Sequence, residues 1–178
     1  REEISKNYFY KMTKIKIALI QMKMSSERQK NMDTAIRKIK EASRKKAKIA
    51  LIQMKMSSDT QKNMSIAIKK IKQASKKKAK IVCLPELFLS NYFCQEEKHS
   101  NFNLAEKIPG KTTSIFSSLS RQLKIIIIVP IFEKKASGVY HNSCVVINEE
   151  GEIIGKYRKM HIPDDPQYYE KFYFTPGD

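Results

Sequence analysis

Short apolar runs of strand length alternate with longer stretches in which apolar residues recur at helical spacing. The runs at 17–22, 49–54 and 81–84 carry few polar residues, which is typical of strands covered on both faces of a sheet. A helical stripe follows the second run, with lysines on its other face and N-cap residues at 57–59. The stripe consists of Met64, Ala67, Ile68, Ile71 and Ala74. This pattern predicts strand–helix–strand units.

The second half of the chain continues the alternation and then changes to a run of strands. A helix is predicted at 112–123 and a buried strand at 124–132. Two further strands are predicted at 139–148 and 153–158, joined by a polar turn. Strands that alternate with helices and then form a hairpin predict an α/β domain with a mixed sheet.

An internal repeat occupies the N-terminal part of the chain. Residues 16–47 and 48–79 align without gaps over 32 positions and differ at seven of them. Two copies followed by unrelated sequence favour a tandem duplication over a solenoid, which usually needs three or more units. The predicted organisation is an extension at 1–15, a duplicated strand–helix unit at 16–47 and a domain at 48–178. The first copy is then an added edge strand and helix, a loose arm, or an element swapped in a dimer.

Most of the net charge of +17 comes from the repeat. The first copy contributes +7 and the second +8, so the rest of the chain is nearly neutral. Basic helices can bind phosphates in a salt-sensitive, unspecific way, which makes a nucleic-acid-binding module one alternative function. Residues 16–79 contain no Phe, Tyr or Trp that could stack on bases. We therefore expect a solvated helix surface and no specific nucleic-acid partner.

Length, cysteine content and hydropathy narrow the class of protein. A chain of 178 residues usually forms one domain with a real core. Cys83, Cys94 and Cys144 are an odd number without close spacing, which argues against a disulfide framework and against a cysteine-rich zinc site. No apolar run approaches the ~18 residues of a membrane span, and the first residues lack the apolar core of a signal peptide. We expect a cytoplasmic protein with no membrane partner.

Three segments carry a family resemblance, which two shorter ones support. They read AKIVCLPELF at 79–88, YRKMHIP at 157–163 and YYEKFYFTPGD at 168–178, with YFCQ at 92–95 and YHNS at 140–143. Together they resemble the nitrilase superfamily of carbon–nitrogen hydrolases, and the last segment is similar to its N-carbamoylputrescine amidase branch. The resemblance implies the N-terminal portion of a nitrilase-like α-β-β-α sandwich with a mixed sheet, extended by the duplicated unit. Without the other half of that sandwich, we expect one face of the sheet to be apolar and exposed.

Hydrolysis of an amide or a ureide needs an activated nucleophile, a proton shuttle and a positive group beside the developing oxyanion. By position alone, Glu86 reads as a surface residue that caps a turn, and Lys159 reads as a solvated lysine. The resemblance instead implies that Glu86 is the general base, that Lys159 stabilises the tetrahedral intermediate and that Glu170 supports Lys159. In the family the nucleophilic Cys lies beyond the position of Asp178, and we expect none of the cysteines of this chain to replace it.

The resemblance also implies a reaction and its partners. The expected substrate is a small ureide or amide, N-carbamoylputrescine, which is hydrolysed to putrescine, carbon dioxide and ammonia without a metal or an organic cofactor. Asp164 and Asp165 are candidates for binding the ammonium tail of this substrate. We expect homo-oligomers, and we expect the 178-residue chain alone to be inactive because it lacks the nucleophile. An inert truncated relic of the enzyme is the remaining alternative.

Overall fold

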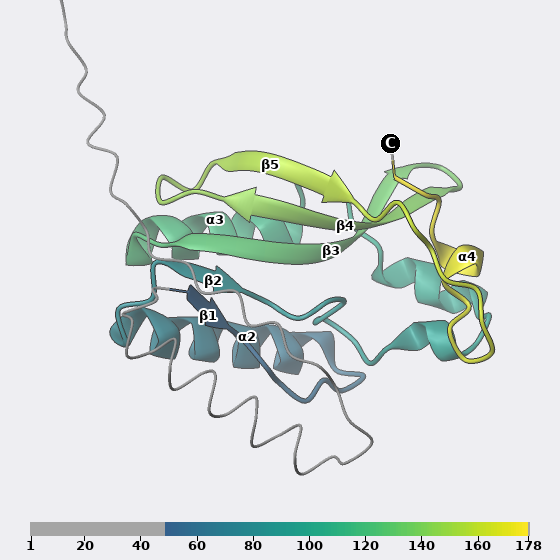
Figure 1. Ribbon diagram of the computed structural model, residues 1–178, viewed down its shortest axis with the longest axis horizontal. Helices are drawn as coiled ribbons and strands as arrows, with labels where there is room; N and C mark the ends of the chain where they lie inside the picture. Colours follow the sequence, from purple (N-terminus) through teal and green to yellow (C-terminus); the bar gives the residue numbers. More distant parts are fainter. Residues whose placement is uncertain (1–48, 178) are drawn as a thin grey trace, which may run out of the picture. The chain divides into compact units, whose positions relative to one another are not determined.

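A computed structural model describes residues 49–177 of the protein (Figure 1). The extension predicted at 1–15 and the first repeat copy predicted at 16–47 lie outside the described residues. The described part has an α/β fold with a mixed sheet, as the sequence predicted. None of its helices is long and apolar enough to cross a membrane. The elements are β1 (Ile49–Leu51), α2 (Thr60–Lys76), β2 (Ile81–Cys83), the 3-10 helices η1 (Phe93–Gln95) and η2 (His99–Leu104), α3 (Lys111–Leu123), β3 (Ile126–Ala136), β4 (Val139–Ile147), β5 (Ile153–Arg158) and α4 (Glu170–Tyr173).

The five strands form one sheet in the order β1-β2-β3-β4-β5. The first three run parallel, so that Ile49 lies opposite Ile81 and Ile81 lies opposite Ile126. β3, β4 and β5 pair antiparallel. A parallel pair needs a crossover connection, which α2 and α3 provide, whereas an antiparallel pair needs only a turn. The carboxyl ends of the parallel strands therefore lie at the same edge of the sheet.

The helix α2 begins where the sequence predicts its N-cap. The carboxylate of Asp59 accepts a hydrogen bond from the backbone N–H of Lys62 (2.9 Å), which satisfies one of the free N–H groups of the first turn. Next to it, Asn63 is fully buried, and its side chain bonds to the backbone of Ser57 and of Leu89. Asn63 therefore fastens the start of the helix to the segment that follows β2.

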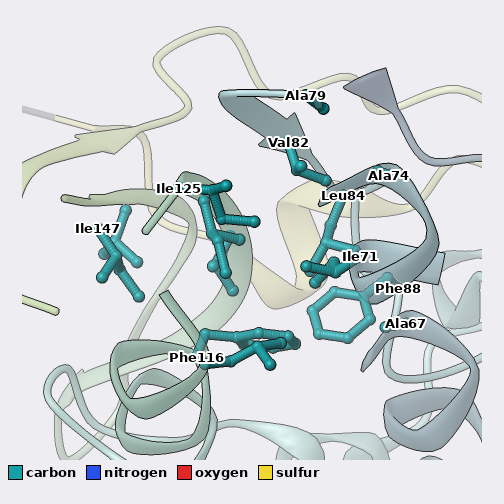
Figure 2. Packing of buried hydrophobic residues seen from close by; sticks show 14 of the residues in the cluster. Ala67, Ile71, Ala74, Ala79, Val82, Leu84, Phe88, Phe116, Ile125 and Ile147 are labelled. Carbon is teal, nitrogen blue, oxygen red and sulfur yellow. The ribbon is translucent and has the colours of Figure 1, made fainter. Parts of the chain in front are cut away.

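One face of the sheet carries the main apolar core (Figure 2). α2 packs Ala67 and Ile71 against this face, and α3 packs Phe116 against it. The rings of Phe88 and Phe116 meet edge to face with their centroids 5.8 Å apart. Removing such side chains from water is the main favourable term in folding. The strands contribute alternate residues to this core, namely Val82, Ile127, Val129, Ile131, Val145 and Ile147.

The alternate residues on the opposite face are also largely apolar, but α2 and α3 do not cover them. The strand pairing aligns Leu51, Cys83, Ile128 and Val146 in one row across the sheet. Leu51 is 79% exposed at one end of this face, and Tyr157 of β5 is 59% exposed at the other. The described part of the chain thus has an exposed apolar sheet face of the kind that the sequence predicted.

A second, mainly aromatic cluster joins η1, β3 and α4. The ring of Phe93 stacks on that of Phe132 with centroids 5.2 Å apart and meets that of Tyr173 edge to face at 4.9 Å. The buried hydroxyl of Tyr173 donates to the carbonyl of Glu96 (2.6 Å) and accepts from the backbone N–H of Lys98 (2.9 Å). These contacts hold α4 and the segment after β2 at fixed positions beside the sheet.

Two strands end three or more residues away from the predicted position. β1 ends at Leu51 instead of residue 54, because its partner β2 ends at Cys83 and only the bond from Ile52 N–H to the Cys83 carbonyl (2.8 Å) continues the pairing. β3 runs to Ala136 instead of residue 132, because its second half pairs with β4. The turn between these strands contains Gly138 with a φ of +73°, which suits a glycine.

Candidate active site

Three charged side chains meet beyond the ends of the strands. Glu86 follows β2, in a turn where Leu87 is buried and has a φ of +49°. Lys159 directly follows β5, and its backbone N–H donates to the carbonyl of Asn142 in β4 (2.8 Å). Glu170 is the first residue of α4. The fold thus brings together side chains that are far apart in the sequence.

Lys159 lies between the two carboxylates. Its Nζ is 2.8 Å from Oε2 of Glu170 and 3.3 Å from Oε1 of Glu86. The side chain of Glu170 is 4% exposed, whereas that of Glu86 is 53% exposed. The inner carboxylate is therefore a fixed counter-ion of the lysine, and the outer carboxylate is open to a reactant.

Burial and the two carboxylates act in opposite directions on Lys159. Burial alone would lower the pKa of its ammonium group, but the hydrogen bond to Glu170 and the charges of Glu86 and Glu170 outweigh that effect. The net result is a raised pKa for Lys159. The group therefore stays a cation at neutral pH and can stabilise a negative charge that develops nearby.

Each carboxylate also accepts a hydrogen bond from a neutral donor. Nδ2 of Asn142 donates to Oε1 of Glu86 (2.5 Å), and the hydroxyl of Tyr92 donates to Oε1 of Glu170 (2.9 Å). Burial, followed by the hydrogen bond to Glu170, raises the pKa of Tyr92, so the phenol stays protonated and remains a donor. Sequence reasoning gave neither residue a role, although both lie in the short segments that supported the family resemblance.

The cysteines of the described part do not provide an activated thiol. Cys94 is fully buried, and burial, followed by the charge of Glu170, raises the pKa of its thiol to about 12. Burial also raises the pKa of Cys144 to about 11 and raises that of Cys83. A nucleophilic Cys needs an accessible position in which its pKa is lowered. Within residues 49–177, no Cys occupies such a position.

The two aspartates predicted to bind the substrate lie in the loop before α4. A carboxylate oxygen of Asp164 is 3.9 Å from Nζ of Lys171, and both side chains are largely exposed. The carbonyl of Asp165 accepts a hydrogen bond from Tyr168 N–H (2.8 Å), which closes a turn. In the described part of the chain, neither carboxylate forms an ion pair with Lys159.

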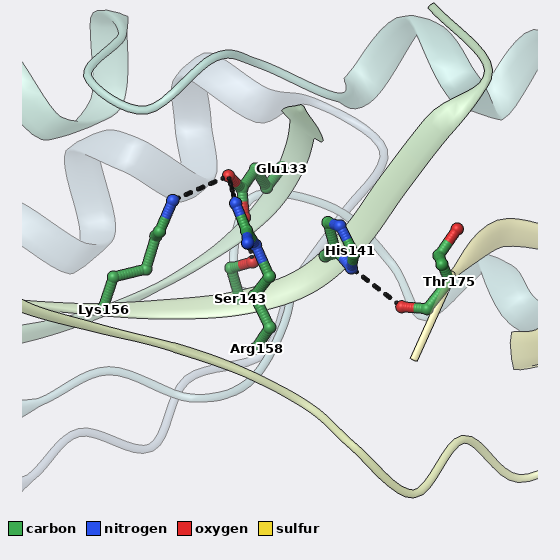
Figure 3. Close-up of polar contacts among 6 residues, drawn as sticks. All are labelled: Glu133, His141, Ser143, Lys156, Arg158 and Thr175. Atoms are coloured by element: carbon green, nitrogen blue, oxygen red, sulfur yellow. Dashed lines mark hydrogen bonds and ion pairs between the residues drawn. The ribbon is translucent and has the colours of Figure 1, made fainter. Parts of the chain in front are cut away.

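Glu133 forms a second, separate cluster of charges on β3, β4 and β5 (Figure 3). Its Oε1 lies 3.1 Å from Nζ of Lys156 and 2.8 Å from Nη2 of Arg158, and its Oε2 accepts from the hydroxyl of Ser143 (2.6 Å) and from Nε of Arg158 (2.8 Å). Burial alone would raise the pKa of Glu133, but the hydrogen bonds from Arg158, Ser143 and Lys156 lower it to about 2. The cluster joins three strands, and sequence reasoning did not predict it.

A backbone hydrogen bond holds the last described residues beside Lys159. The N–H of Gly177 donates to the carbonyl of Lys159 (2.8 Å), and a Cβ at position 177 would lie 2.3 Å from the carbonyl oxygen of Arg158. Only glycine fits this close approach. Two residues earlier, the carbonyl of Thr175 bonds to Nδ1 of His141 in β4 (2.9 Å; Figure 3). The segment after α4 therefore helps to fix the backbone that carries the lysine.

A family model and two named relatives match this chain. The model of the family described as carbon–nitrogen hydrolase matches residues 48–178. The chain is 40% identical over 167 residues to an N-carbamoylputrescine amidase of Oryza sativa subsp. japonica, covering 93% of this chain and 44% of that protein. It is 42% identical over 98 residues to an N-carbamoylputrescine amidase of Solanum lycopersicum, covering 54% of this chain and 32% of that protein.

One solved structure is also similar to this chain in its three-dimensional fold. The crystal structure of a carbon–nitrogen hydrolase from Helicobacter pylori G27 is similar to the chain with a TM-score of 0.69 and 44% identity. The similarity covers 72% of this chain and 45% of that one. The chain therefore spans less than half the length of each of these relatives.

Proposed function

Because the chain belongs to the carbon–nitrogen hydrolase family, we propose that it supplies the general base and the cationic group of a site that hydrolyses a small amide or ureide. The observation that carries this proposal is the position of Lys159 between a buried and an exposed carboxylate, 2.8 Å from Glu170 and 3.3 Å from Glu86. Such an arrangement keeps a positive charge beside a carboxylate that a reactant can reach.

In the proposed reaction, Glu86 accepts the proton of a thiol, and the resulting thiolate attacks the carbonyl carbon of the substrate. The carbonyl oxygen gains negative charge as the C–S bond forms, and the ammonium group of Lys159 stabilises it. The C–N bond then breaks, and the leaving nitrogen takes the proton from Glu86. Glu86 next accepts a proton from a water molecule, which attacks the thioester-like carbon. The proton returns to the sulfur as the C–S bond breaks.

The buried carboxylate has a different task in this scheme. Glu170 is nearly inaccessible and bonds to both Lys159 and Tyr92. It therefore orients the ammonium group and balances its charge without exchanging a proton with the substrate. The exposed Glu86 is left as the group that carries protons.

The thiol of the scheme comes, on this proposal, from a part of the protein outside the 178-residue sequence. The cysteines in the sequence are Cys83, Cys94 and Cys144, and burial raises the pKa of each thiol. The greater length of the relatives supports a contribution from elsewhere, since the chain covers 44% of the rice protein. We accordingly expect the 178-residue chain to release no ammonia by itself.

We propose N-carbamoylputrescine as the substrate, since the relatives from rice and tomato carry the name of an amidase for this compound. Asp164 and Asp165 are the proposed partners of its ammonium tail. The exposed pair of Asp164 and Lys171 is weak enough for a cationic ligand to replace. In the complete protein, Asp165→Asn is expected to raise KM about tenfold, as the loss of one charge-assisted contact does. An unchanged KM would remove Asp165 from the substrate site.

The first experiment is to sequence the native transcript across both repeat copies and past codon 178. A continuation that encodes a Cys after a strand supports the proposal, and the complete protein is then assayed for ammonia release from N-carbamoylputrescine. Glu86→Gln is expected to lower the release about 100- to 10,000-fold, whereas Glu97→Gln, at an exposed carboxylate, should leave it unchanged. A stop codon directly after codon 178, or release that Glu86→Gln does not reduce, contradicts the proposal.

A further inference from the structure

We propose that Asn142 is a positioning residue that determines which oxygen of Glu86 carries the proton during catalysis. This inference rests on the function proposed above and adds the choice of the reactive atom. Asn142 lies in β4, opposite Phe132 of β3, and is 5% exposed. Because the strand ladder holds its backbone, the amide group is presented from a fixed position.

The two donors that contact Glu86 act on the same oxygen. Nδ2 of Asn142 lies 2.5 Å from Oε1, and Nζ of Lys159 lies 3.3 Å from Oε1. Among the described residues, Oε2 accepts no hydrogen bond. An oxygen that accepts from an amide and an ammonium group is a poorer proton acceptor than a free one, because the donors stabilise its negative charge. Oε2 is therefore the oxygen that exchanges the proton.

Asn142 also fixes the distance between the base and the cation. Its side chain holds Glu86, and its backbone carbonyl accepts the N–H of Lys159 at 2.8 Å. An amide suits this task because it donates at every working pH and has no proton to lose to the carboxylate. A carboxylate at the same position would repel Glu86 and compete with it for Lys159.

The contact can be tested in the 178-residue chain without any catalysis. In a sample labelled with 15N-asparagine, the side-chain amide resonance of Asn142 is identified by its absence in Asn142→Ala. A hydrogen bond to a carboxylate moves an amide proton downfield, so the resonance is expected to move upfield in Glu86→Gln and to stay in place in Glu97→Gln. A resonance that does not respond to Glu86→Gln overturns the proposal.

The kinetic test uses the complete protein. Asn142→Ala is expected to lower kcat about 10- to 100-fold with KM within about twofold, because the base is misplaced while the substrate still binds. Asn142→Asp keeps the size of the side chain but replaces the donor with a carboxylate, so the expected loss is larger, about 100-fold or more. A merely structural asparagine would give the opposite order, since the isosteric Asp disturbs the packing less than Ala does.

Asn148→Ala is the matched control. Nδ2 of Asn148 donates to Oε2 of Glu152 at 2.8 Å, which is the same kind of bond in an exposed turn. Its kcat should stay within about twofold of the wild-type value, as for a surface change away from the reactive groups. A larger loss for Asn142→Ala than for Asn142→Asp, or a loss that appears in KM, overturns the positioning role.

The NMR test and the kinetic test together distinguish this inference from the proposed function. If the complete protein is active but the Asn142 resonance does not move in Glu86→Gln, the positioning role alone is overturned. A complete protein without any hydrolysis overturns the proposed function, and the positioning role with it, even when the resonance responds. Support requires both the response of the resonance and the greater loss for Asn142→Asp.

Discussion

Glu86 and Glu133 are both carboxylates paired with cations. Only Glu86 keeps an oxygen that accepts no hydrogen bond from the described residues. Glu133 is 3% exposed, and its two oxygens accept hydrogen bonds from Ser143, Lys156 and Arg158. The side chain of Glu86 is 53% exposed, and both of its donors contact the same oxygen. Charge pairing therefore does not by itself mark a reactive carboxylate in this molecule. What distinguishes Glu86 is the acceptor capacity that its neighbours leave unused.

The two carboxylates also differ in how the fold supports them. Glu133 and its partners lie on adjacent strands, where the ladder between β3, β4 and β5 fixes their spacing. Glu86 lies in a turn after β2, and its partners Asn142 and Lys159 come from β4 and from the end of β5. All the partners of Glu133 thus lie within strands, whereas Glu86 and Lys159 lie outside the strands and only Asn142 is held by one.

The largest effect is expected for Glu86→Gln in the complete protein. Loss of the general base should lower kcat about 100- to 10,000-fold, while the free energy of unfolding changes by less than about 1 kcal/mol because the carboxylate is half exposed. Ammonia release and urea denaturation on the same preparations measure the two quantities. A similar loss of kcat in Glu133→Gln with unchanged stability would remove the contrast between the two residues.

Glu133→Gln should have the larger effect on stability. The substitution removes the carboxylate that Lys156 and Arg158 share in a largely buried place, and breaking such a pair costs about 3–5 kcal/mol. Urea denaturation of the 178-residue chain measures the change in the free energy of unfolding. Glu97→Gln serves as the exposed control, and a loss in Glu133→Gln no larger than in this control would show that the cluster does not stabilise the fold.

Acid should weaken the same cluster over a defined range of pH. The pKa of Glu133 is lowered from an ordinary value of 4.5 to about 2. The unfolded chain therefore takes up this proton at a higher pH than the folded chain, so the stabilisation is present above pH 4.5 and is lost as the pH falls toward 2. The free energy of unfolding should fall more steeply over this range in the wild type than in Glu133→Gln. Equal slopes would contradict the assigned contacts.

Tyr92→Phe should have the smallest of these effects. The change removes one hydrogen bond to the buried Glu170 and is expected to lower the free energy of unfolding by about 1–2 kcal/mol. Tyr168→Phe is the matched control, because its ring lies 5.9 Å from that of Tyr92 and is 55% exposed. Thermal unfolding of both variants measures the difference, and equal stability of the two would argue against a role for the Tyr92 hydroxyl.

The periodicity of apolar residues along the sequence predicted most of the helices and strands of the described fold. The strand predicted at 153–158 has the same bounds in the structure, and α3 begins one residue before the predicted position 112. Periodicity works here because each element buries one continuous apolar stripe or run. The lengths of β1 and β3 were wrong because they depend on where a partner strand ends, which local pattern does not contain.

The residues of the candidate site also fall into two groups, those that the sequence predicted and those that it did not. The segments that carry Glu86, Lys159 and Glu170 could be selected from the sequence because they match a family as a set, and the structure brings their side chains together. Asn142 received no role because a polar residue in a strand has no meaning until its neighbours are known. Glu133 was missed for the same reason, since its partners are set by the register of three strands. Hydrogen bonds across strands are tertiary facts, and spacing along one chain does not encode them.

The register of the parallel strands matches the length of the repeat. Ile49 lies opposite Ile81, 32 residues further along, and each copy of the repeat is also 32 residues long. One copy thus equals one full step from a strand, through a helix, to its neighbour. In evolutionary terms, 32 residues is the length of one complete module of this fold, because residues 49–80 contain one strand, the helix that crosses over and the residues that lead to the neighbouring strand.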